Sequence, residues 1–183
     1  MSGLTPHLDT MPTNPSAWCS LFEASFTASE GADEGQAIRS LAENLLAHTR
    51  RADLNPCWLE TKEVVVAAIC LTRLTFAQET GPIWLLSPVA VHPDHWKTGK
   101  GSTLIRAAMA HLRSEQAAAI VTYGDPGYYG RFGFEHVAAE TVRPPHALSM
   151  PMGWQAKSLK DGGLSGLSSP SRAVAAFDDP ALW

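Results

Sequence analysis

The sequence predicts an α/β fold in which a mixed central sheet carries helices on both faces. Helix-type and strand-type hydrophobic periodicities alternate along the chain. An apolar strand at Val89–Val91 also leads through a glycine-rich loop into an amphipathic helix. The length of 183 residues suits one fold around one core. We expect residues 1–160 to form that domain, and residues 161–183 to form a tail that packs back on it or makes a dimer contact.

Two helices are expected at the start of the chain. Asn14 followed by Pro15 is typical of a helix cap with proline in the first turn, and apolar residues follow at core spacing. A second helix is expected from about Gln36, which leaves residues 29–35 as an acidic loop. Such a loop could meet an amine or be a solvated turn, and we favour the solvated turn.

Strands are expected at residues 57–60 and 64–76, and the second is almost wholly apolar, as in the centre of a sheet. Pro88 lies inside the next strand and removes one hydrogen-bond donor from the ladder. This indicates either an edge strand or a strand that departs from its neighbour, and the loop that follows favours the second. The last strand is expected at residues 154–159.

The loop at 96–102 has the composition of an anion-binding site. Its glycines permit positive φ, so successive N–H groups can converge on an anion at the positive end of the following helix. Lys97 and Lys100 add positive charge. The spacing does not fit a nucleotide P-loop, because Gly101 stands where a hydroxyl residue should follow Lys100. It does not fit the dinucleotide fingerprint either, because Leu104 replaces the third glycine.

A second motif makes the interpretation specific. After an apolar strand, residues 124–134 read Gly-Asp-Pro-Gly-Tyr-Tyr-Gly-Arg-Phe-Gly-Phe. In order and spacing, the strand ending in Val-His-Pro, the glycine-rich loop, the helix, the strand and this motif resemble the GNAT superfamily of acetyl-coenzyme A dependent N-acetyltransferases. The two motifs span about residues 83–134, and the amino-acid sequence of the second motif is similar to that of one predicted-acetyltransferase branch of the superfamily.

The resemblance implies a GNAT-type sheet with a splayed central strand pair and a binding site for acetyl-CoA as cosubstrate. Free backbone groups of the splayed strand would pair with the pantetheine arm, and the N–H groups of the loop would hold the pyrophosphate. The implied cofactor-binding residues are Val89, Ala90, Val91, Lys97, Thr98, Gly99, Lys100, Gly101 and Ser102. The family usually has Gln or Arg where this chain has Trp96, so the charge is relocated to the neighbouring lysines.

The resemblance also implies a catalytic residue. Tyr129 matches the family tyrosine that hydrogen-bonds the coenzyme sulfur and can protonate the departing thiolate. A phenol with a pKa near 10 stays protonated at neutral pH and can act as this donor. The alternative is that Tyr129 and the adjacent Tyr128 only fill the core.

A general base is harder to identify. The carboxylates considered are Glu60, Glu63, Glu79 and Asp125. Asp125 lies nearest the expected thioester site, but it fits better as the cap of the helix that carries Tyr129. His92, Asp94 and His95 could suggest a metal, yet a loop of this kind is more often solvated surface, so we expect no metal.

The expected function is that of an acyltransferase that moves an acetyl group from acetyl-CoA to a primary amine by direct attack within a ternary complex. A backbone N–H of the splayed strand, with Val91 as the first choice, would polarise the thioester carbonyl. The alternative is a non-catalytic acyl-CoA-binding or protein-interaction module on the same fold. The acceptor, a small-molecule or peptide amine, is not identified by any motif.

Composition argues against several other classes. With a formal net charge of −4 and no basic stripe, nucleic acid is not an expected partner. No apolar run reaches the length of a transmembrane helix, and the first residues lack the pattern of a signal peptide. The three cysteines are widely spaced, which suits a reducing compartment. The sequence therefore predicts a cytoplasmic protein without a membrane partner, and a homodimer stays open.

Overall fold

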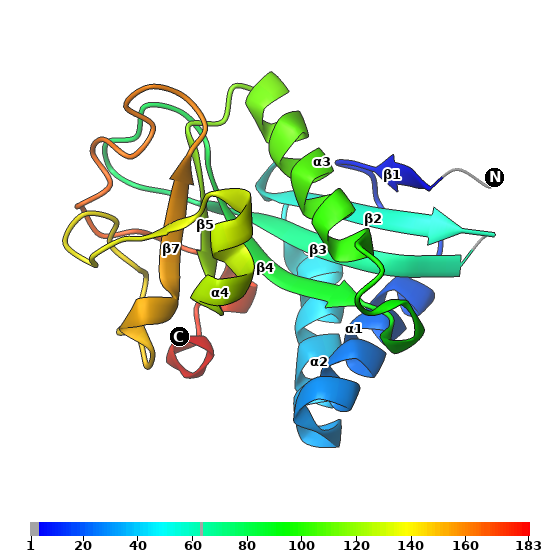
Figure 1. The fold of residues 1–183 in the computed structure, drawn as a ribbon. Coiled ribbons are helices and arrows are strands. Elements are labelled where there is room, and N and C mark those ends of the chain that lie inside the picture. Colours follow the sequence, from blue (N-terminus) through cyan, green and yellow to red (C-terminus); the bar gives the residue numbers. More distant parts are fainter. Residues whose placement is uncertain (1–3, 63) are drawn as a thin grey trace. The chain divides into compact units, whose positions relative to one another are not determined.

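The computed structural model describes residues 4–62 and 64–183 and has an α/β fold (Figure 1). The α-helices of the described chain are α1 (Pro15–Glu30), α2 (Ala32–His48), α3 (Lys100–Ser114) and α4 (Pro126–Tyr129). The strands are β1 (Thr5–His7), β2 (Leu54–Thr61), β3 (Val64–Leu74), β4 (Ile83–Val91), β5 (Ala119–Tyr123), β6 (Glu135–His136) and β7 (Trp154–Ser158). They form a seven-stranded, mostly antiparallel sheet in the order β1-β2-β3-β4-β5-β7-β6, in which β4 and β5 are parallel. The predicted mixed sheet is thus confirmed.

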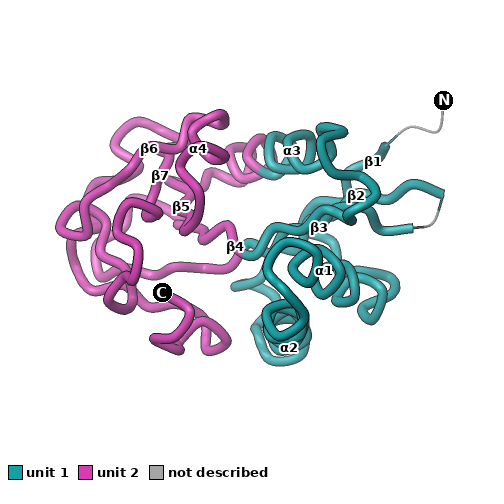
Figure 2. The backbone as a smooth tube through the Cα atoms, turned by 60° about the horizontal axis from the view of Figure 1, so that its bottom comes forward, with its two compact units in different colours: residues 1–71, 88–108 teal, residues 72–87, 109–183 magenta. Residues whose placement is uncertain are grey.

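The chain folds as two compact units (Figure 2). Unit 1 comprises residues up to 71 together with 88–108, and unit 2 comprises residues 72–87 and 109–183. The strands β3 and β4 and the helix α3 each continue from one unit into the other. The helices and strands of each unit are considered separately below.

In unit 1, the cap predicted at Asn14 is confirmed. Its side-chain oxygen accepts a hydrogen bond from the N–H of Ala17 at 3.0 Å, and Pro15 occupies the first turn of α1. Trp18 and Phe22 of this helix are fully buried and meet edge to face, with ring centroids 4.8 Å apart. The helix is therefore held by its apolar face, as its spacing predicts.

The loop predicted at residues 29–35 is wrong, and α2 begins at Ala32 instead of near Gln36. Gly31 alone connects the helices, because its φ of +107° lets the chain turn within one residue. Asp33 and Glu34 lie in the first turn of α2, where carboxylates interact favourably with the helix dipole. The acidic residues thus stabilise a helix and do not form a loop.

Helices cover both faces of the sheet in unit 1. Figures 1 and 2 show α3 on one face and the α1–α2 pair on the other. Between these layers, every residue of β3 from Val66 to Leu71 is buried, which explains the apolar run in this strand. The prediction of helices on both faces is confirmed.

In unit 2, the parallel ladder between β4 and β5 is short. It pairs Ile83–Leu85 with Ala119–Val121, although β4 continues to Val91 and β5 to Tyr123. On its other side β5 pairs with β7 along its whole length, from Ala119 to Tyr123. The ladder therefore ends within both strands, as expected of a splayed pair.

Among residues 4–62 and 64–183, none of the helices has both the length and the apolar character that a membrane span requires.

Candidate functional site

In unit 1, the end of β4 leaves backbone groups available for a ligand. The His92 N–H donates to the Val66 carbonyl at 2.9 Å, which places this end of β4 beside the start of β3, antiparallel to it. Alternate residues of an antiparallel strand direct their amide groups to the same neighbour. Ala90 therefore faces β3 like His92, whereas the N–H and C=O groups of Val89 and Val91 point away from β3.

The loop after β4 is anchored by Trp96. This side chain is 40% exposed, yet its indole N–H donates to the Val91 carbonyl at 2.7 Å. The backbone then enters the left-handed region twice, with φ of 60° at Lys97 and 81° at Gly99. The Gly99 carbonyl accepts from the Thr103 N–H at 2.9 Å and so begins α3. The residue that replaces the usual Gln or Arg thus fixes the start of the loop to the strand.

This loop has the features of an anion-binding nest. Within residues 4–62 and 64–183, no acceptor receives a hydrogen bond from the N–H groups of Lys97, Thr98 or Gly99. Two hydrogen bonds of side chains stabilise the loop. The Thr98 hydroxyl donates to the His95 carbonyl at 2.5 Å, and the Lys100 amine donates to the Thr98 hydroxyl at 3.2 Å. Free N–H groups, a helix start and two lysines together suit a phosphate group.

In unit 2, the short helix α4 presents Tyr129. Asp125 caps this helix, because its carboxylate accepts from the Gly127 N–H at 2.8 Å, so the predicted cap is confirmed. The ring of Tyr129 lies against the backbone of Gly124, where a Cβ would meet the ring at 2.8 Å. Tyr128 is partly exposed and carries the Arg131 guanidinium over its ring at 4.6 Å.

Burial raises the pKa of Tyr129 to about 12. A hydrogen bond with Thr122 works in the opposite direction, and the neighbouring Tyr128 and Asp125 add smaller increases. Thr122 itself is fully buried, and its hydroxyl donates to the Leu86 carbonyl at 2.9 Å. Tyr129 is therefore a protonated phenol throughout the neutral range, in a position fixed by α4 and β5.

Of the carboxylates considered as a base, Glu79 has a structural role. One of its oxygens forms an ion pair with Arg73 at 2.6 Å and the other accepts from the Phe76 N–H at 3.1 Å. Arg73 also donates to the Ile83 carbonyl at 2.7 Å, so the three groups close the turn between β3 and β4. Glu60 is half-buried on β2, and Glu63 lies outside the described residues. Asp125 caps α4.

Next to Gly124, against which the Tyr129 ring lies, is a segment of unit 2 that no sequence motif indicates. We call residues 149–153 the methionine turn; it includes the 3₁₀ helix η4 (Pro151–Gly153) and leads into β7. The Gly124 N–H donates to the Gly153 carbonyl at 3.0 Å. The amide of the buried Gln155 donates to the Gly124 and Gly153 carbonyls at 3.2 and 3.3 Å. No local pattern indicates the two contacts with Gly124, because they join segments about 30 residues apart in the chain.

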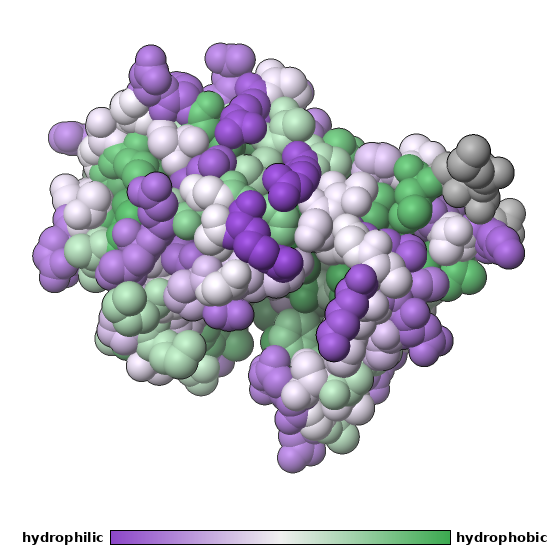
Figure 3. All heavy atoms as spheres, viewed as in Figure 1, coloured by the Kyte–Doolittle hydropathy of each residue, from purple (hydrophilic) through white to green (hydrophobic). Residues whose placement is uncertain are grey.

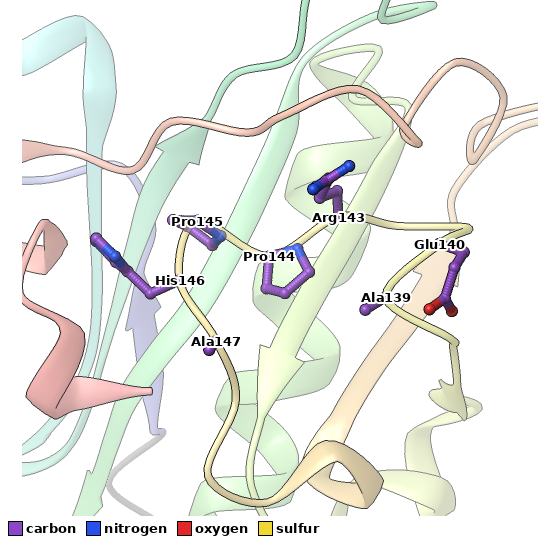
Figure 4. Close-up of a pocket in the computed structure, with 7 residues that line it drawn as sticks. All are labelled: Ala139, Glu140, Arg143, Pro144, Pro145, His146 and Ala147. Carbon is purple, nitrogen blue, oxygen red and sulfur yellow. The ribbon is translucent and has the colours of Figure 1, made fainter.

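The connection between β6 and β7 also contains a pocket of about 410 Å³ (Figure 4). Its lining consists of Ala139, Glu140, Arg143, Pro144, Pro145, His146 and Ala147. The His146 imidazole lies 2.9 Å from the Asp178 carboxylate in the C-terminal segment. Charges of both signs line the pocket, so it has no evident preference for an anion or a cation.

The residues considered as metal ligands lie in the loop that follows β4. The His92 imidazole is 3.7 Å from the Asp94 carboxylate, and its ring centroid is 6.1 Å from that of His95. No three His, Cys, Asp or Glu side chains in the described part of the chain are grouped as a metal site would require.

Comparison with known proteins identifies the family. The model of the acetyltransferase (GNAT) family matches residues 16–134, which is more than half of the chain. The chain therefore belongs to the GNAT acetyltransferase family, and the family predicted from the sequence is confirmed. Both segments described above, the loop after β4 and α4 with Tyr129, lie within the matched residues.

Individual relatives agree with this. The uncharacterized N-acetyltransferase YjhQ of Escherichia coli is 30% identical over 122 residues, which are 58% of this chain and 67% of the relative. A GNAT acetyltransferase from Brucella melitensis in complex with acetyl-CoA is 25% identical, with a TM-score of 0.67 over 95% of this chain and 99% of that one. The fold is also that of the Escherichia coli GNAT protein YhbS in complex with CoA, with a TM-score of 0.76, 22% identity and coverage of 96% and 92%.

Proposed function

We propose that the protein transfers an acetyl group from acetyl-CoA to a primary amine by direct attack within a ternary complex. The observation that carries the proposal is the loop that leads into α3, in which three free N–H groups (residues 97–99) lie with Lys97 directly before Lys100, the first residue of the helix. Family membership supports it, as does the acetyl-CoA complex of the relative from Brucella melitensis.

The cosubstrate would be bound mainly by backbone groups. The pyrophosphate would accept hydrogen bonds from the N–H groups of residues 97–102, with Lys97 and Lys100 supplying charge. The pantetheine arm would pair with the outward groups of Val89 and Val91, which point away from β3. Because the Val91 carbonyl already accepts from Trp96, the Val91 N–H and both amide groups of Val89 are the free partners.

The reaction requires no covalent enzyme intermediate. The amine, after losing its proton to solvent, attacks the thioester carbonyl carbon, and the new C–N bond forms as the carbonyl oxygen becomes negative. An outward N–H of β4, at Val91 or Val89, would stabilise this oxyanion. The nitrogen of the tetrahedral intermediate then gives its extra proton to water, the carbonyl forms again and the C–S bond breaks. The leaving thiolate takes a proton from the Tyr129 hydroxyl, which regains one from water.

Calorimetric titration of acetyl-CoA tests the binding half of the proposal. Reversal of charge in Lys97→Glu should weaken affinity at least about tenfold, or about 1.4 kcal/mol. Gly101→Glu, which places a carboxylate in the first turn of α3, should abolish binding. Lys62→Glu is the matched control, since Lys62 is an exposed lysine of unit 1 outside this loop. Equal losses in Lys97→Glu and Lys62→Glu would contradict the assignment of the loop.

Release of free thiol in the presence of a panel of amines tests the chemical half. Transfer that is strongly reduced in Tyr129→Phe, with acetyl-CoA affinity unchanged, is the expected result. Tight binding of acetyl-CoA without transfer to any amine would favour the non-catalytic acyl-CoA-binding module.

A further inference from the structure

The side chain of Trp96 is an exposed aromatic surface within a polar loop of unit 1. It is 40% exposed, and the other residues from 94 to 98 are all polar or charged. Figure 3, in the view of Figure 1, shows purple, hydrophilic atoms among pale ones over the region of this loop. One ring among polar groups is too small for a protein interface, but it has the right size to contact one apolar group of a small ligand.

The Val91 carbonyl places the ring at the free edge of β4. This carbonyl points away from β3, because the next N–H along the chain, that of His92, is bonded to β3. The indole N–H of Trp96 donates to the Val91 oxygen at 2.7 Å, so the indole lies in front of this oxygen, on the outward side of the strand. The ring therefore borders the same edge as the outward backbone groups of Val89.

The ring also lies directly before the free N–H groups of the loop. The Trp96 N–H donates to the Pro93 carbonyl at 3.1 Å, and the 3₁₀ helix η2 (Pro93–His95) closes the turn between the strand and the indole. The next residue, Lys97, has a φ of 60° and begins the run of free N–H groups at residues 97–99. Trp96 is thus bonded to the strand at one end of the proposed cosubstrate site and covalently joined to the nest at the other.

The chemistry of CoA matches this order of groups. Its pantetheine arm has amides that can pair with the edge of β4, and its diphosphate can accept from the N–H groups of the nest. The segment that joins these two parts is the pantoyl group, which carries two methyl groups on one carbon. A CoA molecule that used both the strand and the nest would therefore bring its most apolar segment to the indole.

We infer that Trp96 is a specificity-determining residue of the cosubstrate site, in which the exposed indole face binds the geminal methyl groups of the pantoyl segment. The inference rests on the proposed function and assigns a role to the residue that stands in place of the usual Gln or Arg. A Gln or Arg side chain offers hydrogen bonds or charge, whereas the indole offers apolar surface, and its N–H is already used by Val91. The site thus obtains more of its affinity from the pantoyl segment and less from the diphosphate.

Calorimetric titration with two ligands tests the inference. The first is CoA, and the second is its nucleotide half, 3′-phosphoadenosine 5′-diphosphate, which lacks the pantoyl segment. Trp96→Gln should weaken CoA binding about tenfold, because the apolar contact is lost, and should not weaken binding of the nucleotide half. Trp96→Phe keeps an aromatic ring, so its affinity for CoA should stay within about threefold of the wild type. Met11→Gln, at a methionine of unit 1 with the same exposed fraction of 40%, is the matched control and should change neither affinity.

The comparison of ligands separates this role from a purely structural one. If Trp96 only anchored the loop, Trp96→Gln would weaken both ligands alike, and this result would overturn the inference while CoA binding stands. A loss of CoA affinity in Trp96→Phe as large as that in Trp96→Gln would overturn it too, because the ring is retained.

Nuclear magnetic resonance gives a direct measurement of the contact. In the wild type with CoA, nuclear Overhauser effects should connect the geminal methyl protons of the ligand with the indole ring protons of Trp96. Their absence in a saturated complex would overturn the inference and leave the proposed function intact. Failure of the wild type to bind CoA at all would instead refute the proposed function together with the inference.

Discussion

Lys97 adopts a backbone conformation that glycine would adopt without strain. Its φ of 60° lies in the left-handed region, where a side chain costs about 1–2 kcal/mol. Lys62 has the same kind of strain, with φ of 49°, outside the loop. The strain at Lys97 is consistent with a residue kept for its charge at the proposed phosphate site.

Replacing Lys97 by glycine should therefore change stability and binding in opposite directions. We expect Lys97→Gly to raise the free energy of unfolding by about 0.5–1 kcal/mol, since relief of strain exceeds the added chain entropy. It should also weaken acetyl-CoA binding through the lost charge. Urea denaturation and calorimetry measure the two effects. Lys62→Gly should give the gain in stability alone, and unchanged affinity in Lys97→Gly would contradict the role given to this lysine.

The pKa of Tyr129 sets a second expectation at the residue scale. Because burial raises this pKa to about 12, the hydroxyl keeps its proton above the usual tyrosine value and loses it only as the pH approaches 12. Tyr129→Phe should reduce the transfer rate about 100-fold. The ratio of wild-type to variant rates should stay constant from pH 7 to 10. A ratio that falls to about half of its neutral value by pH 10 would show a donor with an unshifted pKa.

The helices α1 and α2 approach each other closely at Gly35. A Cβ at this position would lie 1.9 Å from the Thr27 hydroxyl oxygen and 2.8 Å from the Glu23 carbonyl oxygen. The second contact is with backbone, which cannot move without shifting the helix. The pair therefore depends on a glycine inside α2, although glycine is unfavourable in a helix.

We expect Gly35→Ala to lower the free energy of unfolding by about 1–3 kcal/mol, despite the better helix propensity of alanine. Thermal or urea denaturation would show it. Gly130→Ala is a suitable control, because Gly130 has right-handed helical dihedrals and nothing within 4 Å of an added Cβ. Equal free energies of unfolding in the two variants would mean that α1 and α2 can move apart at Gly35 without loss of stability.

Elements that depend on local chemistry could be predicted from the sequence. The caps at Asn14 and Asp125 were predictable because a short side chain bonds the backbone two or three residues onward. The junction at Gly31 was not, since an acidic, glycine-containing segment suits a loop as well as two abutting helices. The bond of Trp96 to Val91 and the Gln155 contacts were also missed, because the direction of a side chain and contacts distant in sequence leave no periodic signal.

At the scale of the whole molecule, the C-terminal segment contributes to the core of unit 2. Trp183 is only 5% exposed, and its indole donates to the Phe177 carbonyl at 3.0 Å. Its ring lies 6.2 Å from that of Tyr123 and 5.8 Å from that of Trp154. The last residues of the chain thus pack beside the strand that leads to α4.

Trp183→Ala should lower the free energy of unfolding by about 3–5 kcal/mol, because it removes a large buried aromatic side chain. Leu182→Ala, at a neighbour that is 37% exposed, should cost less than about 1 kcal/mol. Denaturation followed by tryptophan fluorescence would compare them. A similarly small decrease in the free energy of unfolding for both variants would place the C-terminal segment outside the cooperative core.

The interleaving of the two units has a consequence for synthesis on the ribosome. Unit 1 needs residues up to 108, and unit 2 needs residues from 72 to the last segment, so neither is complete until residue 108 has been translated. The apolar strand β3 stays unpaired with β4, and accessible to chaperones, until β4 and α3 have left the exit tunnel of the ribosome. No single cut in the gene leaves both units intact, so any two-fragment version would have to rebuild at least one unit by complementation.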